Sequence, residues 1–87
     1  RGHWEIRYSN KVIRRYVIQA NGDVIWDDFL IGRIVRSDGT LLLQQERDAK
    51  LERLTLGVDG RLFIEHWRHA SHFPDGSFLF GIGTREE

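Results

Sequence analysis

Four copies of one short phrase constrain the fold of this chain more than any other feature. Each copy has Asn-Gly or Asp-Gly, then one polar residue, then three apolar residues, and the copies lie at residues 21–26, 38–43, 59–64 and 75–80. Asparagine and glycine tolerate the positive φ of a tight turn, so these dipeptides between apolar runs are a strong hairpin signal. The phrase therefore predicts a meander of antiparallel hairpins.

Alternation of apolar and polar side chains predicts where the strands run. Trp4, Ile6 and Tyr8, for example, share one face of a strand, while Glu5 and Arg7 share the other. Eight strands are predicted, over residues 4–8, 12–20, 24–26, 31–36, 40–44, 50–56, 61–68 and 77–83.

Helical signals are weak, and residues 46–49 favour one helical turn at most. We therefore expect an all-β fold, an antiparallel meander of about eight short strands. An up-and-down small barrel or a curled sheet suits such a chain because it removes or shortens free strand edges.

Length and composition exclude several classes of protein. A chain of 87 residues forms one domain, 1–87, and we expect it to be excised from a longer chain because it begins at Arg1 and has no Met. The 13 basic and 13 acidic residues cancel, so bulk attraction to nucleic acid or to an anionic membrane is not expected. No apolar run approaches a membrane span. With no Cys there is neither a disulfide framework nor a thiolate metal site, which leaves the compartment open.

Strand register can be predicted at the Asp59-Gly60 turn. A two-residue turn would mix core with polar positions across the hairpin. A three-residue loop, 58–60, with Gly60 in the left-handed conformation, pairs apolar residues with apolar residues and opposite charges with each other across the two strands. It predicts the pairs Leu56 with Leu62, Leu54 with Ile64, Arg53 with Glu65, and Glu52 with His66.

The other turns are less constrained. At Asn21-Gly22 we predict a two-residue turn, which sets Tyr16 opposite Asp27. At residues 37–39 the pattern leaves open whether Ile34 or Val35 points inward. The fourth copy, at Asp75-Gly76, closes a longer loop.

Three histidines spaced three residues apart form the densest candidate for chemistry: His66, His69 and His72. Imidazoles suit zinc or copper, and Glu65 or Asp75 could complete a metal site. We favour a purely structural role, in which His66 pairs with Glu52 at the edge of the core and the other two histidines lie in a solvated loop.

Catalysis by Glu65 and His66 is not expected. Adjacent strand residues point to opposite faces of the sheet and cannot share a site. We therefore predict no catalytic residue and no cofactor.

A basic stretch with aromatic neighbours lies near the start of the chain. It contains Arg7, Lys11, Arg14 and Arg15, and such a surface can bind single-stranded nucleic acid. The predicted first hairpin places acidic residues 27 and 28 across from it, so we interpret this stretch as a solvated, ion-paired face and expect no nucleic-acid partner.

Apolar residues occur on both faces of the predicted strands. The predicted inward set is Tyr16, Ile18, Trp26, Leu54, Leu56, Leu62, Ile64, Phe78 and Phe80, and the outward set is Ile13, Val17, Ile25, Leu51, Phe63, Trp67 and Leu79. A contiguous outward patch marks an interface, and aromatic residues often anchor one.

We therefore predict a non-catalytic interaction module. Its outward patch of Phe63, Trp67 and Leu79 would contact a protein partner or a second copy of the chain. The alternative is that some of these residues lie under the loop at Phe73-Pro74 or against the rest of a longer chain.

The two ends of the chain carry one resemblance. Gly2-His3-Trp4 opens the first strand and Arg85 follows the last, which resembles the pattern of calycin (lipocalin-like) β-barrels. The resemblance implies that Arg85 packs over Trp4 by cation–π stacking and closes one end of a barrel. It also implies a small hydrophobic ligand, and Trp4 and Arg85 would then be structural.

Overall fold

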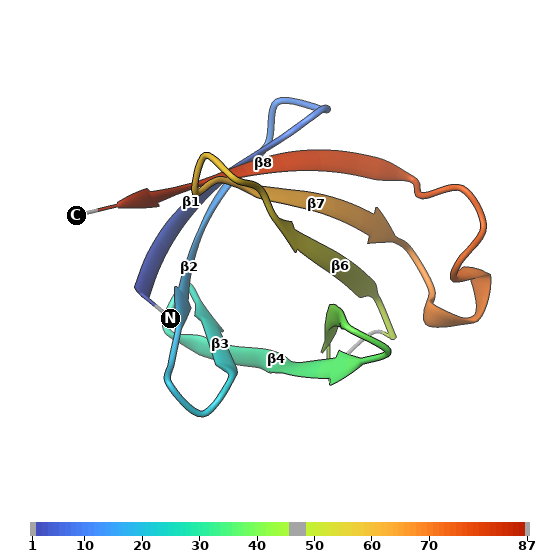
Figure 1. The fold of residues 1–87 in the computed structure, drawn as a ribbon, viewed down its shortest axis with the longest axis horizontal. Helices are drawn as coiled ribbons and strands as arrows, with labels where there is room; N and C mark the ends of the chain where they lie inside the picture. The colour runs from blue at the N-terminus through green and yellow to red at the C-terminus, as the bar shows by residue number, and fades with distance from the viewer. Residues whose placement is uncertain (1, 46–48, 87) are drawn as a thin grey trace.

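The chain folds into a single closed barrel of eight antiparallel strands in sequence order (Figure 1). The computed structural model describes residues 2–45 and 49–86. The strands are β1 (Gly2–Tyr8), β2 (Ile13–Ile18), β3 (Asp23–Trp26), β4 (Phe29–Ser37), β5 (Thr40–Gln45), β6 (Leu51–Leu56), β7 (Leu62–Trp67) and β8 (Leu79–Glu86). The predicted all-β meander is confirmed, with the barrel rather than the open sheet as its form.

Closure joins the first strand to the last. β1 pairs with β8 in an antiparallel ladder in which Trp4 lies opposite Arg85 and Tyr8 opposite Gly81. A closed barrel leaves no free sheet edge, which removes the main route by which β-sheets aggregate. The single helical element is a 3-10 turn, η1 (Ala70–His72), among the described residues. None of the described helical structure is long and apolar enough to cross a membrane. The helical turn considered for residues 46–49 falls mostly outside the described residues.

The β2–β3 and β6–β7 hairpins share one turn geometry. In each, a three-residue loop ends in a glycine with positive φ, Gly22 at 93° and Gly60 at 83°. In each, the side chain before that glycine accepts a backbone N–H two residues on: Asn21 Oδ1 from Asp23 at 2.9 Å, and Asp59 Oδ1 from Arg61 at 3.0 Å.

The register predicted at Asp59-Gly60 is confirmed in all four of its pairs. The prediction at Asn21-Gly22 is wrong by one residue, because the loop there also has three residues and Tyr16 lies opposite Trp26 instead of Asp27.

The remaining two copies of the phrase differ from these and from each other. Asp38 and Gly39 both have positive φ and form a two-residue turn between Ser37 and Thr40. This register turns Ile34 towards the core and leaves Val35 exposed. The Asp75-Gly76 copy forms no hairpin turn and ends the long loop 68–78 that contains η1.

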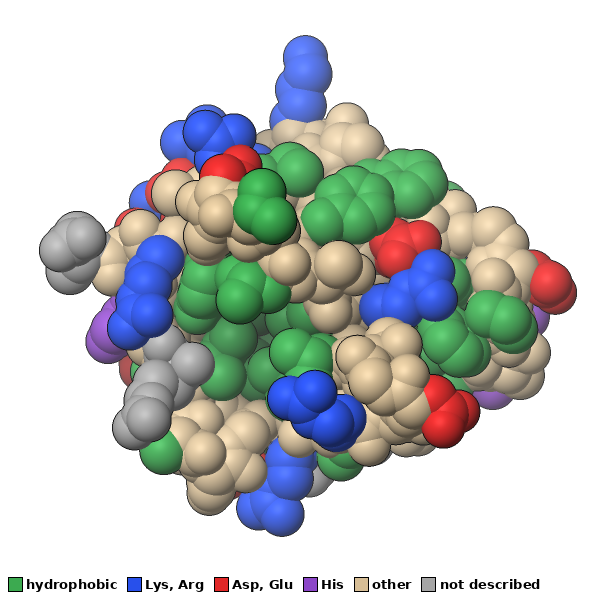
Figure 2. Space-filling model, viewed as in Figure 1, with side chains coloured by type: hydrophobic (Ala, Val, Ile, Leu, Met, Phe, Trp, Pro, Cys, Tyr) green, Lys and Arg blue, Asp and Glu red, His purple; other side chains and the backbone are tan. Residues whose placement is uncertain are grey.

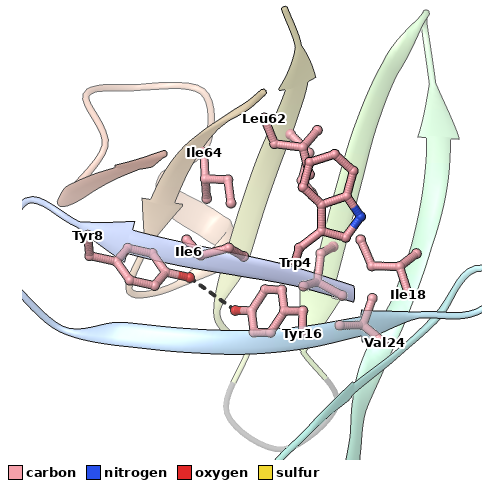
Figure 3. Packing of buried hydrophobic residues seen from close by; sticks show 10 residues of the cluster. Trp4, Ile6, Tyr8, Tyr16, Ile18, Val24, Leu62 and Ile64 are labelled. Atoms are coloured by element: carbon pink, nitrogen blue, oxygen red, sulfur yellow. Dashed lines mark hydrogen bonds between the residues drawn. The ribbon is translucent and has the colours of Figure 1, made fainter. Parts of the chain in front are cut away.

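Large side chains from β1 and β2 fill the centre of the barrel. Trp4, Ile6 and Tyr16 are buried there and pack with Leu62 and Ile64 from β7 (Figure 3). An eight-stranded barrel is just wide enough for side chains to fill it. Such packing is what the sequence pattern of β1 predicts.

The predicted orientation of β8 is wrong by one position. Phe78 and Phe80, expected inside, are exposed, and Gly81 and Gly83 face the core instead. A Cβ on Gly81 would lie 3.1 Å from Cδ1 of Tyr8, and a Cβ on Gly83 would lie 3.2 Å from Cβ of Leu62. The bulky neighbours occupy the volume that inward side chains of β8 would need, so β8 turns its glycines inward.

Candidate functional site

A cluster of hydrogen-bonded polar side chains lies inside the barrel near the end that carries loop 68–78. Its centre is the carboxylate of Glu52 in β6, which is fully buried. The hydroxyl of Tyr8 donates to Glu52 Oε2 at 2.6 Å, and that of Tyr16 donates to Oε1 at 2.9 Å. His66 Nδ1 lies 2.8 Å from Oε2, and the two hydroxyls lie 3.0 Å apart. Four different strands therefore converge on one carboxylate.

Strand alternation explains why these four side chains meet. Glu52 and His66 are directly paired across β6 and β7, and both occupy the inward positions that continue the core rows of these strands. Tyr8 ends the inward row of β1, and Tyr16 lies in the inward row of β2. The hydrogen bond between His66 Nδ1 and Glu52 Oε2 confirms the structural role predicted for His66, as a partner of Glu52 at the edge of the core.

Arg14 covers the cluster at the mouth of the barrel. It lies opposite Ile6 on the inward side of β2, and its guanidinium is 4.4 Å from the ring centre of Trp26 and 5.5 Å from that of Tyr8. Burial by itself would lower the pKa of Arg14, but Tyr16, Tyr8 and Glu52 together raise it. Arg14 is therefore a permanent cation above the buried carboxylate.

The same environment keeps both tyrosines protonated. Burial, followed by the negative charge of Glu52, raises the pKa of Tyr8 and of Tyr16 well above the ordinary value. Protonated tyrosines act as donors to Glu52, which accepts from three groups. The opening above the cluster, lined by residues that include Asn10, Val12 and Leu79, has a volume of about 50 Å³, roughly the space of one or two waters. The arrangement satisfies its own hydrogen bonds and holds the barrel wall together.

The three histidines considered for a metal site are not gathered in one place. His66 points into the barrel towards Glu52, whereas His69 precedes η1 and His72 is its last residue, in the outer loop, with ring centres 6.0 Å apart. Within residues 2–45 and 49–86, no group of three or more His, Cys, Asp or Glu side chains is placed to hold a metal ion. His69 instead caps η1, with Nδ1 accepting the backbone N–H of Ser71 at 3.1 Å.

The predicted outward patch also needs correction. Phe63 is on the outer face and 40% exposed, but Trp67 is only 2% exposed. Loop 68–78 covers Trp67: the ring of Phe73 meets it edge-on at 5.0 Å, and its Nε1 donates to the carbonyl of Asp75 at 2.6 Å. Leu79 pairs with His66 and packs against the core. The alternative that placed outward residues under the Phe73-Pro74 loop therefore describes Trp67.

A different set of apolar residues surrounds Phe63 on the outer face. We call Phe63, Phe80 and Ile82 the outer patch, and their exposed fractions are 40, 47 and 43%. Phe63 lies directly opposite Ile82, and the rings of Phe63 and Phe80 stack at 5.8 Å with an interplanar angle of 21°. The alternation of Phe80 and Ile82 with two glycines is the sequence signal that could have revealed this patch, because two inward glycines leave the apolar residues between them outward.

Trp4 and Arg85, the two residues that carry the calycin resemblance, are directly paired between β1 and β8. Trp4 is buried, while Arg85 is exposed and its guanidinium lies next to Gly2. The indole Nε1 of Trp4 is buried and has no hydrogen-bond partner among the described residues, and it lies on the side of the ring away from the Tyr8–Tyr16 pair (Figure 3).

Comparison with known proteins identifies no relative. No family model matches the chain, and neither the curated proteins nor the solved structures give a significant match. The geometry of the chain is therefore the basis for the function proposed below.

Proposed function

We propose that this domain is a non-catalytic interaction module that contacts a protein partner, or a second copy of itself, through the outer patch. The observation that carries this proposal is the stacked pair of Phe63 and Phe80 on the solvent side of β7 and β8. A ring stack at the surface keeps two large apolar groups in a fixed position, which suits an interface anchor.

The surroundings of the outer patch have the composition of an interface rim. Arg53 and Glu65 form a two-pronged ion pair beside it, at 2.7 and 3.0 Å. On its other side Arg7 pairs with Glu5 at 2.9 Å. In Figure 2, hydrophobic side chains gather over β7 and β8 next to acidic and basic ones. An apolar centre with a polar rim is typical of protein–protein contacts.

A depression beside Phe80 adds to the apolar area. It has a volume of about 170 Å³ and is lined by Arg7, Tyr8, Ser9, Phe80, Gly81 and Ile82. A side chain from a partner fits a depression of this kind, which supports the outer patch as a contact surface.

Sedimentation velocity over a range of concentrations tests self-association, and cross-linking with mass spectrometry in extracts tests a partner. We expect Phe80→Ser to abolish the concentration-dependent rise in sedimentation coefficient or the cross-links to the partner. Phe29→Ser is the matched control, because it replaces an exposed phenylalanine on β4, and it should behave as wild type. A monomer whose cross-links are the same in both variants would refute the proposal.

Binding of a small hydrophobic ligand, which the calycin resemblance implies, stays a prediction. The side chains of Trp4, Ile6 and Tyr16 occupy the centre of the barrel, where such a ligand would be enclosed.

A further inference from the structure

A cleft opens in the barrel wall where β5 and β6 separate. The two strands are paired only from Gln44 to Leu41 on β5, and β6 continues beyond Leu54 with Thr55 and Leu56. The cleft that results has a volume of about 540 Å³, which is within the usual range for small-molecule sites. It borders the outer patch at the Arg53–Glu65 pair, but Phe63, Phe80 and Ile82 do not line it.

The inner side of the cleft is apolar. Leu54 is buried in the core, Leu41 packs against it, and Leu56 is 62% exposed. All three line the cleft. The face drawn in Figure 2 is hollowed, with hydrophobic side chains in the hollow and basic ones at its edge. A continuous strip of leucines from core to solvent suits a short apolar chain.

The rim of the cleft is polar, and among the described residues that line it one cation has no ion pair. Arg36 lies opposite Leu41, on the side of β4 that turns towards the leucines, and its side chain lines the cleft. No ion pair to Arg36 is found within the described residues. Arg53 also lines the cleft, but its guanidinium is held by Glu65 through two hydrogen bonds. That pair is neutral as a unit, so Arg36 sets the charge of the rim.

We propose that this cleft binds a small organic carboxylate with an apolar chain. The apolar chain of the ligand lies along Leu54 and Leu56, and its carboxylate pairs with Arg36. Thr40 and Thr55 also line the cleft. Guanidinium and carboxylate match in shape and charge, and the pairing gives the cleft its preference for anions. None of the three outer-patch residues lines this site, and the proposal goes beyond the interaction proposed above.

An NMR titration with octanoate tests the proposal. We expect saturable shifts of the backbone amide signals of Thr40, Leu41, Thr55 and Leu56. Arg36→Gln should raise the dissociation constant about tenfold, the effect of losing one charged contact. Arg61→Gln is the matched control, because Arg61 is an exposed arginine that does not line the cleft, and it should leave the dissociation constant unchanged.

Two further arms separate the possible outcomes. Octanol, which has the chain without the charge, should bind at least tenfold more weakly than octanoate. Phe80→Ser should leave octanoate binding intact, so failure of the outer patch and failure of the cleft are distinguishable. Shifts confined to amides elsewhere, equal binding by Arg36→Gln, or equal binding of octanol would each overturn the proposal.

Discussion

At the scale of single residues, the interior of the barrel depends on Glu52. Three donors from three other strands end on its carboxylate. A buried donor that loses its acceptor keeps the full cost of leaving water, which exceeds the net gain of an ordinary hydrogen bond. Glu52 is therefore a structural residue whose loss is felt on four strands at once.

Replacing Glu52 by alanine should destabilise the protein strongly. We expect Glu52→Ala to lower the free energy of unfolding by about 3–5 kcal/mol, because two hydroxyls and an imidazole lose their acceptor. Glu52→Gln keeps one acceptor oxygen and should cost less. Urea denaturation followed by circular dichroism measures both. Glu65→Ala, which removes a partly exposed ion pair, should cost less than about 1 kcal/mol; similar losses for Glu52→Ala and Glu65→Ala would contradict this account.

The two tyrosines of the chain should fail to ionise at their usual pH. Burial and the charge of Glu52 raise the pKa of Tyr8 and Tyr16 in the folded state, while in the unfolded chain each ionises near pH 10. Because the folded pKa is the higher one, this stabilisation is complete below about pH 10 and is lost as pH rises above it.

Ultraviolet absorbance of tyrosinate on raising the pH measures this effect. The chain has only these two tyrosines, so the signal is unambiguous. In urea both should titrate near pH 10, whereas in the native protein the absorbance should rise only as circular dichroism reports unfolding. Reversible ionisation near pH 10 in a folded barrel would contradict the burial of the two hydroxyls.

At the scale of elements, β8 illustrates how neighbours decide the orientation of a strand. Phe80 and Ile82 are large apolar residues of β8, yet they face outward while Gly81 and Gly83 face the core. The reason lies in β1 and β7, whose Tyr8, Ile6 and Leu62 already fill the space in front of the glycines. A one-residue shift of register would put phenylalanine into that volume.

Adding a single methyl group to an inward glycine of β8 should be costly. We expect Gly81→Ala and Gly83→Ala each to lower the free energy of unfolding by about 1–3 kcal/mol through overpacking. Gly76→Ala is the matched control, because a Cβ there meets nothing within 4 Å and Gly76 has no positive φ. Chemical denaturation of the three variants compares them. If Gly81→Ala and Gly83→Ala left the free energy of unfolding unchanged, β8 could shift to accommodate the added methyl group, and this explanation of its orientation would be wrong.

At the scale of the whole molecule, the surface of the barrel has three distinct regions: the end with loop 68–78, the end with the chain termini, and the outer patch. One end carries loop 68–78, the other the two chain ends, which lie together on the opposite side (Figure 1). Loop 68–78 folds over the outer face of β7 and hides Trp67, while the outer patch on β7 and β8 stays open. The loop therefore sets the extent of the apolar surface left for a partner.

Truncating Phe73 should uncover Trp67. We expect Phe73→Ala to lower the free energy of unfolding by about 1–2 kcal/mol, because a half-buried ring is lost from its contact with Trp67 and Arg53. The variant should also increase acrylamide quenching of tryptophan fluorescence. Phe78→Ala, which removes an exposed ring that packs on Arg68, should change neither quantity much. Equal quenching in both variants would mean that Phe73 does not shield Trp67.

Much of the architecture could be predicted from local sequence, because turn chemistry and alternation act over a few residues. Asp59-Gly60 predicts its own loop and four cross-strand pairs, including Glu52 with His66. The Asn21-Gly22 loop has the same geometry, but its length could not be predicted, since no charge pattern in that hairpin distinguishes a two-residue from a three-residue loop. The candidate site was only half predictable: the Glu52–His66 pair follows from register, but its two tyrosine partners do not.

The sequence alone therefore determined an all-β meander, the positions of its strands and the hairpin that pairs Glu52 with His66. These follow from backbone preferences of Asn, Asp and Gly and from a period of two. Only the tertiary structure decided that β8 turns its glycines inward, that Trp67 is covered, and that Tyr8 and Tyr16 meet Glu52. Each of these depends on which distant side chain already occupies a volume, and that is set by closing the barrel.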